Sequence, residues 1–222
     1  MDKKKLGVEN TYFEFEIPGD MENLKLPDPG LVMFYRNLDR RILWLDSEID
    51  DHSIEYAKQI MEWNMEDAEI SAEKRKPITI LFFSPGGDLD MNNLLVDTIQ
   101  LSDTPIIGVN CGVAASAACF IYLACHKRYT FPTAKFLIHQ GSGEFSGTYD
   151  IVCAAITNYQ AQIKRLGDFV IERTNIPEEL FYANFSSDWY IDAQEAVEYG
   201  IAHGVIKSLS ELFSMKGGAN PD

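Results

Sequence analysis

Residues 76–88 read KPITILFFSPGGD, and this stretch decides the class of fold. After Lys76 it is apolar and β-branched for the length of one strand. Such a run is typical of a parallel strand that is buried on both faces. Pro85, Gly86 and Gly87 follow it and favour a sharp turn. The stretch therefore predicts a buried parallel strand that ends abruptly.

Two interpretations of this turn remain open. Gly86 and Gly87 can present backbone N–H groups to a ligand with no Cβ in the way, which suits an oxyanion hole or a clamp on an extended peptide. Alternatively, the segment is a plain type II turn with Pro85 in second position and Gly86 in third.

Strand and helix patterns alternate on both sides of this stretch. We expect strands at residues 41–45, 104–109 and 135–138, and helices at residues 51–70, 91–101, 116–125 and beyond 148. Asp51 is a plausible cap for the first helix. Asp192 and Glu195 form a capping box, and Gly200 suits the end of that last helix. The alternation predicts an α/β fold with a largely parallel sheet.

Composition excludes several classes of function. The chain has 222 residues, 46% of them hydrophobic, and a net charge of −15. That charge argues against nucleic acid and anionic membrane surfaces as partners. We see no secretory signal, no run long enough to span a membrane, and no glycine-rich phosphate loop. The four cysteines lack CxxC spacing and lie in apolar segments, so we interpret them as reduced core thiols of a cytoplasmic protein.

The two ends of the chain differ from its middle. Residues 1–30 carry prolines, glycines and scattered charges, and we expect an N-terminal arm or axial loop. Residues 209–222 end in a glycine-containing polar segment, which indicates a flexible tail. Residues 31–208 are then expected to form one domain.

One serine stands among alanines in GVAASAACF, residues 112–120. Ser116 lies near a predicted strand-to-helix junction, where free N–H groups and the helix dipole would stabilise an oxyanion. The stretch taken alone favours simple close packing of small residues. It also lacks the GxSxG motif of the α/β-hydrolases.

A nucleophilic serine needs a base and a group that orients the base. His139 directly follows the predicted strand at 135–138 and precedes a glycine-rich loop, a usual place for catalytic groups in open α/β sheets. It could equally be a strand-end histidine bonded to backbone. Asp188 is flanked by Ser187 and Trp189, and nearby aromatic residues could shield its carboxylate, although a plain turn residue is the simpler interpretation.

Four separated motifs together resemble one family. SPGGD, GVAASAACF, FLIHQ and DWYIDAQEAVEYGI occur in the order and approximate spacing of the proteolytic subunit of the Clp protease. The resemblance runs from about Val32 to Ile206. It implies a spiral of ββα units, shared with the crotonases, with a protruding strand–helix handle formed by GSGEFSGT and the long helix after it.

The resemblance also implies the site and its partners. Ser116 would be the nucleophile, His139 the general base and Asp188 the orienting carboxylate. The backbone N–H groups of Gly87 and Ala117 would form the oxyanion hole. Residues that would hold an extended substrate strand are Gly86, Gly141, Gly143 and Phe145. The family needs no cofactor and no metal, and it assembles as stacked heptameric rings that receive unfolded polypeptide from a hexameric AAA+ ATPase unfoldase.

Other functions remain possible on the same motifs. Phage prohead proteases and other Clp-like proteases that act without an unfoldase carry similar SPGG and AAS motifs. A ring scaffold without activity would normally have lost a triad residue. A crotonase acting on CoA thioesters would normally use carboxylates instead, and a Ser–Lys peptidase would need Lys127 or Lys135 as its base.

Overall fold

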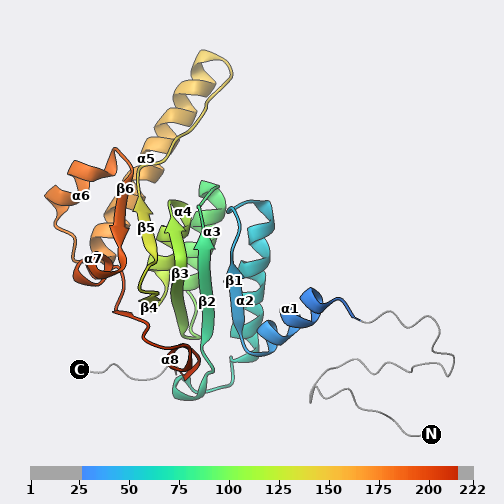
Figure 1. The fold of residues 1–222 in the computed structure, drawn as a ribbon. Coiled ribbons are helices and arrows are strands. Elements are labelled where there is room, and N and C mark those ends of the chain that lie inside the picture. The colour runs from blue at the N-terminus through green and yellow to red at the C-terminus, as the bar shows by residue number, and fades with distance from the viewer. Residues whose placement is uncertain (1–26, 215–222) are drawn as a thin grey trace, which may run out of the picture. The chain divides into compact units, whose positions relative to one another are not determined.

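The computed structural model describes residues 27–214 of the chain (Figure 1). The chain divides into two compact units, Met1–Arg36 and Asn37–Asp222. Most of the expected N-terminal arm therefore lies outside the described residues. Helix α1 (Pro29–Asp39) was not anticipated from the sequence, and the carboxylate of Asp28 accepts from the N–H groups of Gly30 and Leu31 at its start.

The second unit is an α/β fold around one sheet. In chain order its strands are β1 (Ile42–Leu45), β2 (Ile78–Ser84), β3 (Ile106–Ala115), β4 (Lys127–Thr130), β5 (Lys135–Ile138), β6 (Trp189–Asp192) and β7 (Gly204–Val205). Its α-helices are α2 (Ile54–Glu66), α3 (Leu89–Gln100), α4 (Ala117–Ala124), α5 (Tyr149–Arg173), α6 (Glu178–Phe185), α7 (Ala193–Glu198) and α8 (Leu209–Ser214). The predicted class of fold is confirmed.

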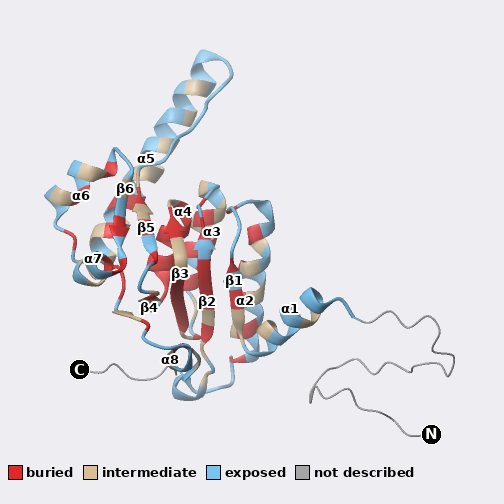
Figure 2. Ribbon diagram, viewed as in Figure 1, coloured by how far each residue is buried: buried red, intermediate tan, exposed pale blue. Residues whose placement is uncertain are grey.

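The sheet is largely parallel, as expected. The order is β1-β2-β3-β4-β7, and β5 pairs with both β3 and β6. Among the described strands only β5 and β6 run antiparallel. Side chains on one face of β1, β2 and β3 form the main core with α2, α3 and α4, whose eight residues are all buried (Figure 2).

Strand β3 is longer than expected and pairs with two different strands along its length. Its first half pairs with β4, and its last three residues pair with β5 instead. Asn110 lies at the point where the partner changes and is fully buried. Its side-chain amide donates to the carbonyl of Lys135 at 2.9 Å and accepts from the N–H of Gly112 at 3.1 Å. Asn110 thus replaces the strand pairing that β3 loses where it leaves β4.

Two helix boundaries test the sequence rules. The first helix is shorter than 51–70, and Asp50 rather than Asp51 caps the 3₁₀ turn that leads into it. The capping box of Asp192 and Glu195 is formed, and Gly200 has the positive φ of +69° expected after a helix end. The spacing of apolar residues correctly located the helix near residues 51–70. Which of two neighbouring aspartates caps it depends on the backbone, because the cap residue must be extended, as Asp50 is.

The handle has the expected long helix but not the expected strand. Helix α5 projects beyond the sheet, and the segment at 141–148 runs beside it (Figure 1). That segment is not a strand in the described structure. It is held to the helix by Tyr159, whose hydroxyl donates to the carbonyl of Gln140 at 3.0 Å and whose ring meets Phe145 edge-on.

The flexible tail expected at residues 209–222 begins with a short helix. Residues Leu209–Ser214 form α8, and Leu212 is buried against the second face of the sheet, beside Ile107 and Val109. Residues 215–222 lie outside the described part of the chain. No helix within residues 27–214 is long and apolar enough to cross a membrane.

The interpretation of the cysteines holds for only part of the set. Cys119 and Cys125 are buried free thiols, and burial raises the pKa of each to about 12. Cys111 is partly exposed, and Cys153 is exposed in the first turns of α5. Cys153 is therefore not a core thiol, because the projecting helix gives its side chain nothing to pack against at that position.

Replacing Asn110 with alanine should destabilise the fold sharply. The Asn110→Ala change removes the side-chain partner of the Lys135 carbonyl and of the Gly112 N–H, both in part-buried hydrogen bonds. A polar group left unpaired away from water costs about 1–3 kcal/mol. Asn184→Ala is the control, because Asn184 donates only to the carbonyl of Leu180 in its own helix. Chemical denaturation followed by circular dichroism should show the larger loss for Asn110→Ala. Equal losses would contradict the role given to Asn110.

Candidate active site

Ser116 lies at the sharp turn between β3 and α4. It is the N-cap residue of α4, with φ +52° and ψ −125°, a region that non-glycine residues seldom adopt. Its N–H donates to the carbonyl of Leu137 at 2.9 Å, and its carbonyl accepts from the N–H of Cys119 at 2.9 Å. The surrounding structure thus holds a strained backbone in place, which is a feature of functional positions.

The turn after β2 lies directly against this serine. A Cβ placed on Gly86 would come within 2.5 Å of the carbonyl oxygen of Ala115 and 2.8 Å of the Cβ of Ser116. Gly86 also has φ +94°. Its N–H already donates to the Ser84 hydroxyl and its carbonyl accepts from Ile49, so Gly86 contributes close approach rather than free polar groups. Gly86 therefore meets two needs at once, a positive φ and a close approach to Ser116.

Antiparallel pairing of β5 and β6 brings the other two candidates together. Ile138, the last residue of β5, lies opposite Trp189, the first of β6. His139 follows β5 and Asp188 precedes β6, so the two side chains meet at the same edge. The His139 Nδ1 lies 3.0 Å from the Asp188 carboxylate, and its Nε2 lies 2.8 Å from the Ser116 hydroxyl. The three residues singled out from the sequence form one hydrogen-bonded chain.

The environment of Asp188 differs from the expectation. Its side chain is 58% exposed, so aromatic neighbours do not shield it. Trp189 packs edge-on against Tyr199, and Tyr190 is itself exposed. Alternation along β6 explains this, because Trp189 and Tyr190 point to opposite faces of the strand and neither covers the residue before them.

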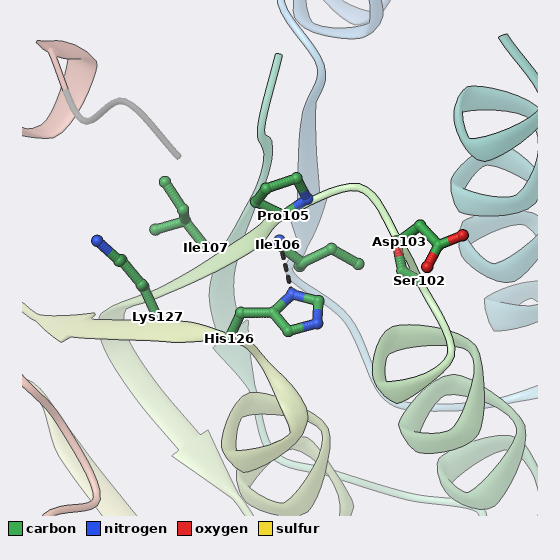
Figure 3. A pocket seen from close by; sticks show the side chains of 7 residues that line it. All are labelled: Ser102, Asp103, Pro105, Ile106, Ile107, His126 and Lys127. Atoms are coloured by element: carbon green, nitrogen blue, oxygen red, sulfur yellow. Dashed lines mark hydrogen bonds between the residues drawn. The ribbon is translucent and has the colours of Figure 1, made fainter. Parts of the chain in front are cut away.

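The other candidate bases are engaged elsewhere. The ammonium of Lys135 lies over the ring of Tyr190, 5.7 Å from its centroid. Lys127 lines a pocket at the first residues of β3, roughly ten strand residues away from Ser116 (Figure 3). His126 lines the same pocket and accepts from the N–H of Ile106 through Nδ1, and burial lowers its pKa. That pocket is therefore separate from the serine.

Two backbone amides lie beside Ser116 without a hydrogen-bond acceptor among the described residues. Ala117 is the first residue of α4, and its nitrogen is 2.9 Å from the position of a Cβ on Gly86. Gly87 lies next along that turn. The neighbouring groups Gly86 O and Asp88 N–H pair with Ile49, which leaves the N–H of Gly87 free.

The expected substrate-binding residues of the handle lie in sequence after His139. Gly141 has φ +79°, and a Cβ there would lie 3.1 Å from the Tyr159 hydroxyl. A Cβ on Gly143 would lie 3.0 Å from the ring of Phe145. Both glycines therefore let the segment lie flat against α5. Within residues 27–214, no group of three His, Cys, Asp or Glu side chains could hold a metal ion.

The conformation of Ser116 is the functional feature that sequence reasoning missed. The sequence lacks the GxSxG motif that marks a strained serine turn in the α/β-hydrolases, yet the backbone at Ser116 makes the same kind of strained strand-to-helix turn. The only signal was the set of small residues around the serine. Small side chains are compatible with strain but do not require it.

Comparison with known proteins agrees with this geometry. A sequence model described as Clp protease matches residues 31–209. The ATP-dependent Clp protease proteolytic subunit 1 of Leifsonia xyli subsp. xyli is 32% identical over 197 residues, which cover 85% of this chain and 94% of the relative. Subunit 2 of Pseudomonas aeruginosa is also 32% identical, over 142 residues that cover 61% of this chain and 69% of the relative.

A solved structure confirms the fold. A ClpP1 mutant from Listeria monocytogenes superposes with a TM-score of 0.68 and 26% sequence identity, covering 81% of this chain and 99% of the other. The spiral architecture shared with the crotonases, expected from the motifs, is thus confirmed. Since the family match covers most of the described domain, the chain belongs to the Clp protease family and is a serine-type endopeptidase.

Proposed function

We propose that Ser116, His139 and Asp188 carry the peptide-bond hydrolysis of this Clp-type protease, on unfolded polypeptide substrates. The observation that carries the proposal is the continuous chain of hydrogen bonds from Asp188 through His139 to Ser116, at 3.0 and 2.8 Å. These distances are within the range in which a base can accept a proton from a nucleophile.

Proton transfer begins at the serine. With the histidine proton on Nδ1 and donated to Asp188, Nε2 is free to accept the proton of the Ser116 hydroxyl. The oxygen then attacks the carbonyl carbon of the scissile peptide. The Asp188 carboxylate holds the ring in this tautomer and stabilises the imidazolium that forms.

The negative charge develops on the former carbonyl oxygen. The N–H groups of Gly87 and Ala117 would receive it, and the N-terminal end of α4 adds a favourable dipole. His139 next gives its proton to the leaving amine, which breaks the C–N bond and leaves an acyl ester on Ser116. Water, activated by the same histidine, then hydrolyses the ester.

The substrate would bind as an added strand along the handle. Backbone recognition of this kind depends on main-chain hydrogen bonds and accepts many sequences. The segment through Gly141, Gly143 and Phe145 is exposed, and it directly follows His139. Gly86, on the other side of Ser116, leaves room for the substrate chain to approach.

Assembly into stacked heptameric rings, served by an AAA+ unfoldase in the cytoplasm, completes the proposal. Parallel sheets occur almost only with both faces covered. Here α8 covers part of the second face, while Trp44 and Phe83 on that side are 42% and 54% exposed. Another copy of the chain is the occupant that a ring would supply.

The alternatives receive less support. An inactive ring scaffold would not need two well-formed hydrogen bonds on the serine and histidine. A protease that acts without an unfoldase would carry the same SPGG and AAS motifs, and most of the N-terminal segment that differs from the family pattern, residues 1–26, lies outside the described part of the chain.

Triad substitutions should abolish labelling by a fluorophosphonate probe. We expect wild type to label, Ser116→Ala and His139→Ala not to label, and Asp188→Asn to slow peptide hydrolysis by about 10²- to 10⁴-fold because the histidine loses its orienting carboxylate. Asp150→Asn, at an exposed position of α5, is the matched control. An assembled wild-type protein that neither labels nor cleaves an unstructured peptide would overturn the proposal.

A methyl group on Gly86 should impair catalysis. Gly86→Ala places a Cβ against Ala115 and Ser116 and should lower kcat by at least about tenfold, because the two amides and the serine move apart. At Gly204 the same change meets only ordinary contacts of 3.7–3.8 Å, so Gly204→Ala should keep its rate. Steady-state hydrolysis of a fluorogenic peptide separates the two. An unchanged rate in Gly86→Ala would refute the close-approach role.

A charge on the second face of the sheet should prevent assembly. Phe83→Asp would place a carboxylate where a neighbouring copy is expected, so native mass spectrometry should show smaller species than for wild type. Leu101 is 83% exposed at the end of α3, on a different part of the surface. Leu101→Asp should leave the mass unchanged. A Phe83→Asp protein with the wild-type mass would argue against this face as the ring contact.

A further inference from the structure

Arg128 is a buried arginine whose side-chain hydrogen bonds within the described chain all go to backbone carbonyl groups. It lies in β4 and is 4% exposed. Its five N–H donors are directed at five carbonyl oxygens, and no carboxylate bonds to it. A buried guanidinium without an acidic partner is unusual, because burial of a charge is costly unless other groups compensate it. The five carbonyl groups provide that compensation.

The five carbonyls lie at, or just after, the C-terminal ends of three helices. The carbonyls of Leu123 and Cys125 end α4, at 3.1 and 3.3 Å from the guanidinium. The carbonyl of Arg173 ends α5, at 3.1 Å. Those of Gly200 and Ile201 directly follow α7, at 3.1 and 2.8 Å. The last carbonyls of a helix have no partner within it and carry its negative partial charge, so one cation serves the ends of α4 and α5 together with the turn after α7.

A second arginine reinforces the same junction. Arg173 is the last residue of α5, and its own guanidinium donates to Leu123 at 3.1 Å and to Cys125 at 3.0 Å. Burial lowers the pKa of Arg128, and the nearby charge of Arg173 lowers that pKa further. Two like charges are thus held at the end of α4 by carbonyl groups alone.

Helix α4 carries Ser116 at its other end. Helix α4 has eight residues, so its N-terminal residue Ala117 lies only about 12 Å from the arginine junction. Helix α7 directly follows β6, which begins next to Asp188. Because α4 has only eight residues, a displacement of its C-terminal end would be transmitted along the helix as a rigid body to Ser116.

We propose that Arg128 and Arg173 are positioning residues for Ser116: they fix the C-terminal end of α4 against the ends of α5 and α7, and so set the place of the hydroxyl and the Ala117 amide at its N-terminal end. The inference rests on the proposed role of Ser116 as the nucleophile. The arginine junction also connects the handle helix α5, which ends at Arg173, to the helix that follows Ser116.

Two variants weaken the junction in different ways. Arg128→Lys keeps the positive charge but has three donors on one nitrogen, which cannot reach all three helix ends. Arg173→Ala removes the partly exposed half and leaves Arg128 in place, so the proposal can be tested even if Arg128→Lys does not fold. Arg41→Lys is the matched control, because Arg41 makes tertiary bonds to Glu66, Asp67 and the Lys76 carbonyl and contacts neither α4 nor the site.

The measurements are the thermal unfolding midpoint, the native mass, and kcat and KM for a fluorogenic peptide on the full chain in its assembled form. We expect both junction variants to lose about 10- to 100-fold in kcat, since the nucleophile is displaced. KM should change by less than about twofold, because the substrate segment packs on α5 at Tyr159, about 21 Å along the helix from Arg173. Arg41→Lys should lower the unfolding midpoint without changing kcat. The double variant should lose less than the product of the single losses, because both side chains hold the same two carbonyls.

Failure of the inference is distinct from failure of the proposed function. If assembled wild type labels at Ser116 and both variants keep the wild-type kcat, Arg128 and Arg173 only stabilise the fold and the inference is wrong. If Arg41→Lys also lost kcat in proportion to its lower unfolding midpoint, the losses in all three variants would reflect stability alone, and the inference would again be wrong. If wild type itself does not label at Ser116, the proposed function fails first.

Discussion

The side-chain amide of Asn110 lies where β3 leaves β4 and begins to pair with β5. A strand that changes partners must leave backbone groups unpaired at the change, and in a buried sheet those groups need a substitute. Asn110 supplies it to Lys135 and Gly112. Because of this change of partner, the end of β5 lies beside the end of β3. His139 can then meet Ser116 only because the two strands end together.

Ser116 illustrates how the fold supports a costly conformation. A positive φ on a residue with a side chain costs about 1–3 kcal/mol unless the surroundings compensate it. Its backbone is bonded on one side to β5 and on the other to the first turn of α4. Gly86 lies against it, where any side chain would collide. The chain thus fixes Ser116 by backbone bonds, and its hydroxyl is left to interact with His139.

Much of this could be predicted from the sequence, and the rest depends on tertiary contacts. The buried strand at 76–83, the alternation of elements and the capping box at Asp192 follow from local patterns, and all are present. Ser116, His139 and Asp188 were identified by motifs, and the structure brings them together. The exposure of Asp188, the change of partner at Asn110 and the burial of Leu212 were not predicted. Each of these three features depends on contacts between residues far apart in the chain, and the spacing of apolar residues along the sequence carries no information about such contacts.

The uneven burial of the four cysteines has a practical consequence for studying the handle. Cys119 and Cys125 have thiols with a pKa of about 12, and Cys111 has one of about 11, so little thiolate is available at neutral pH in any of them. Cys153 is exposed near the beginning of α5, in the projecting part of the molecule. The natural chain therefore offers one selective attachment point for a spectroscopic label, placed on the element that ends at the arginine junction, without any cysteine having to be added or removed.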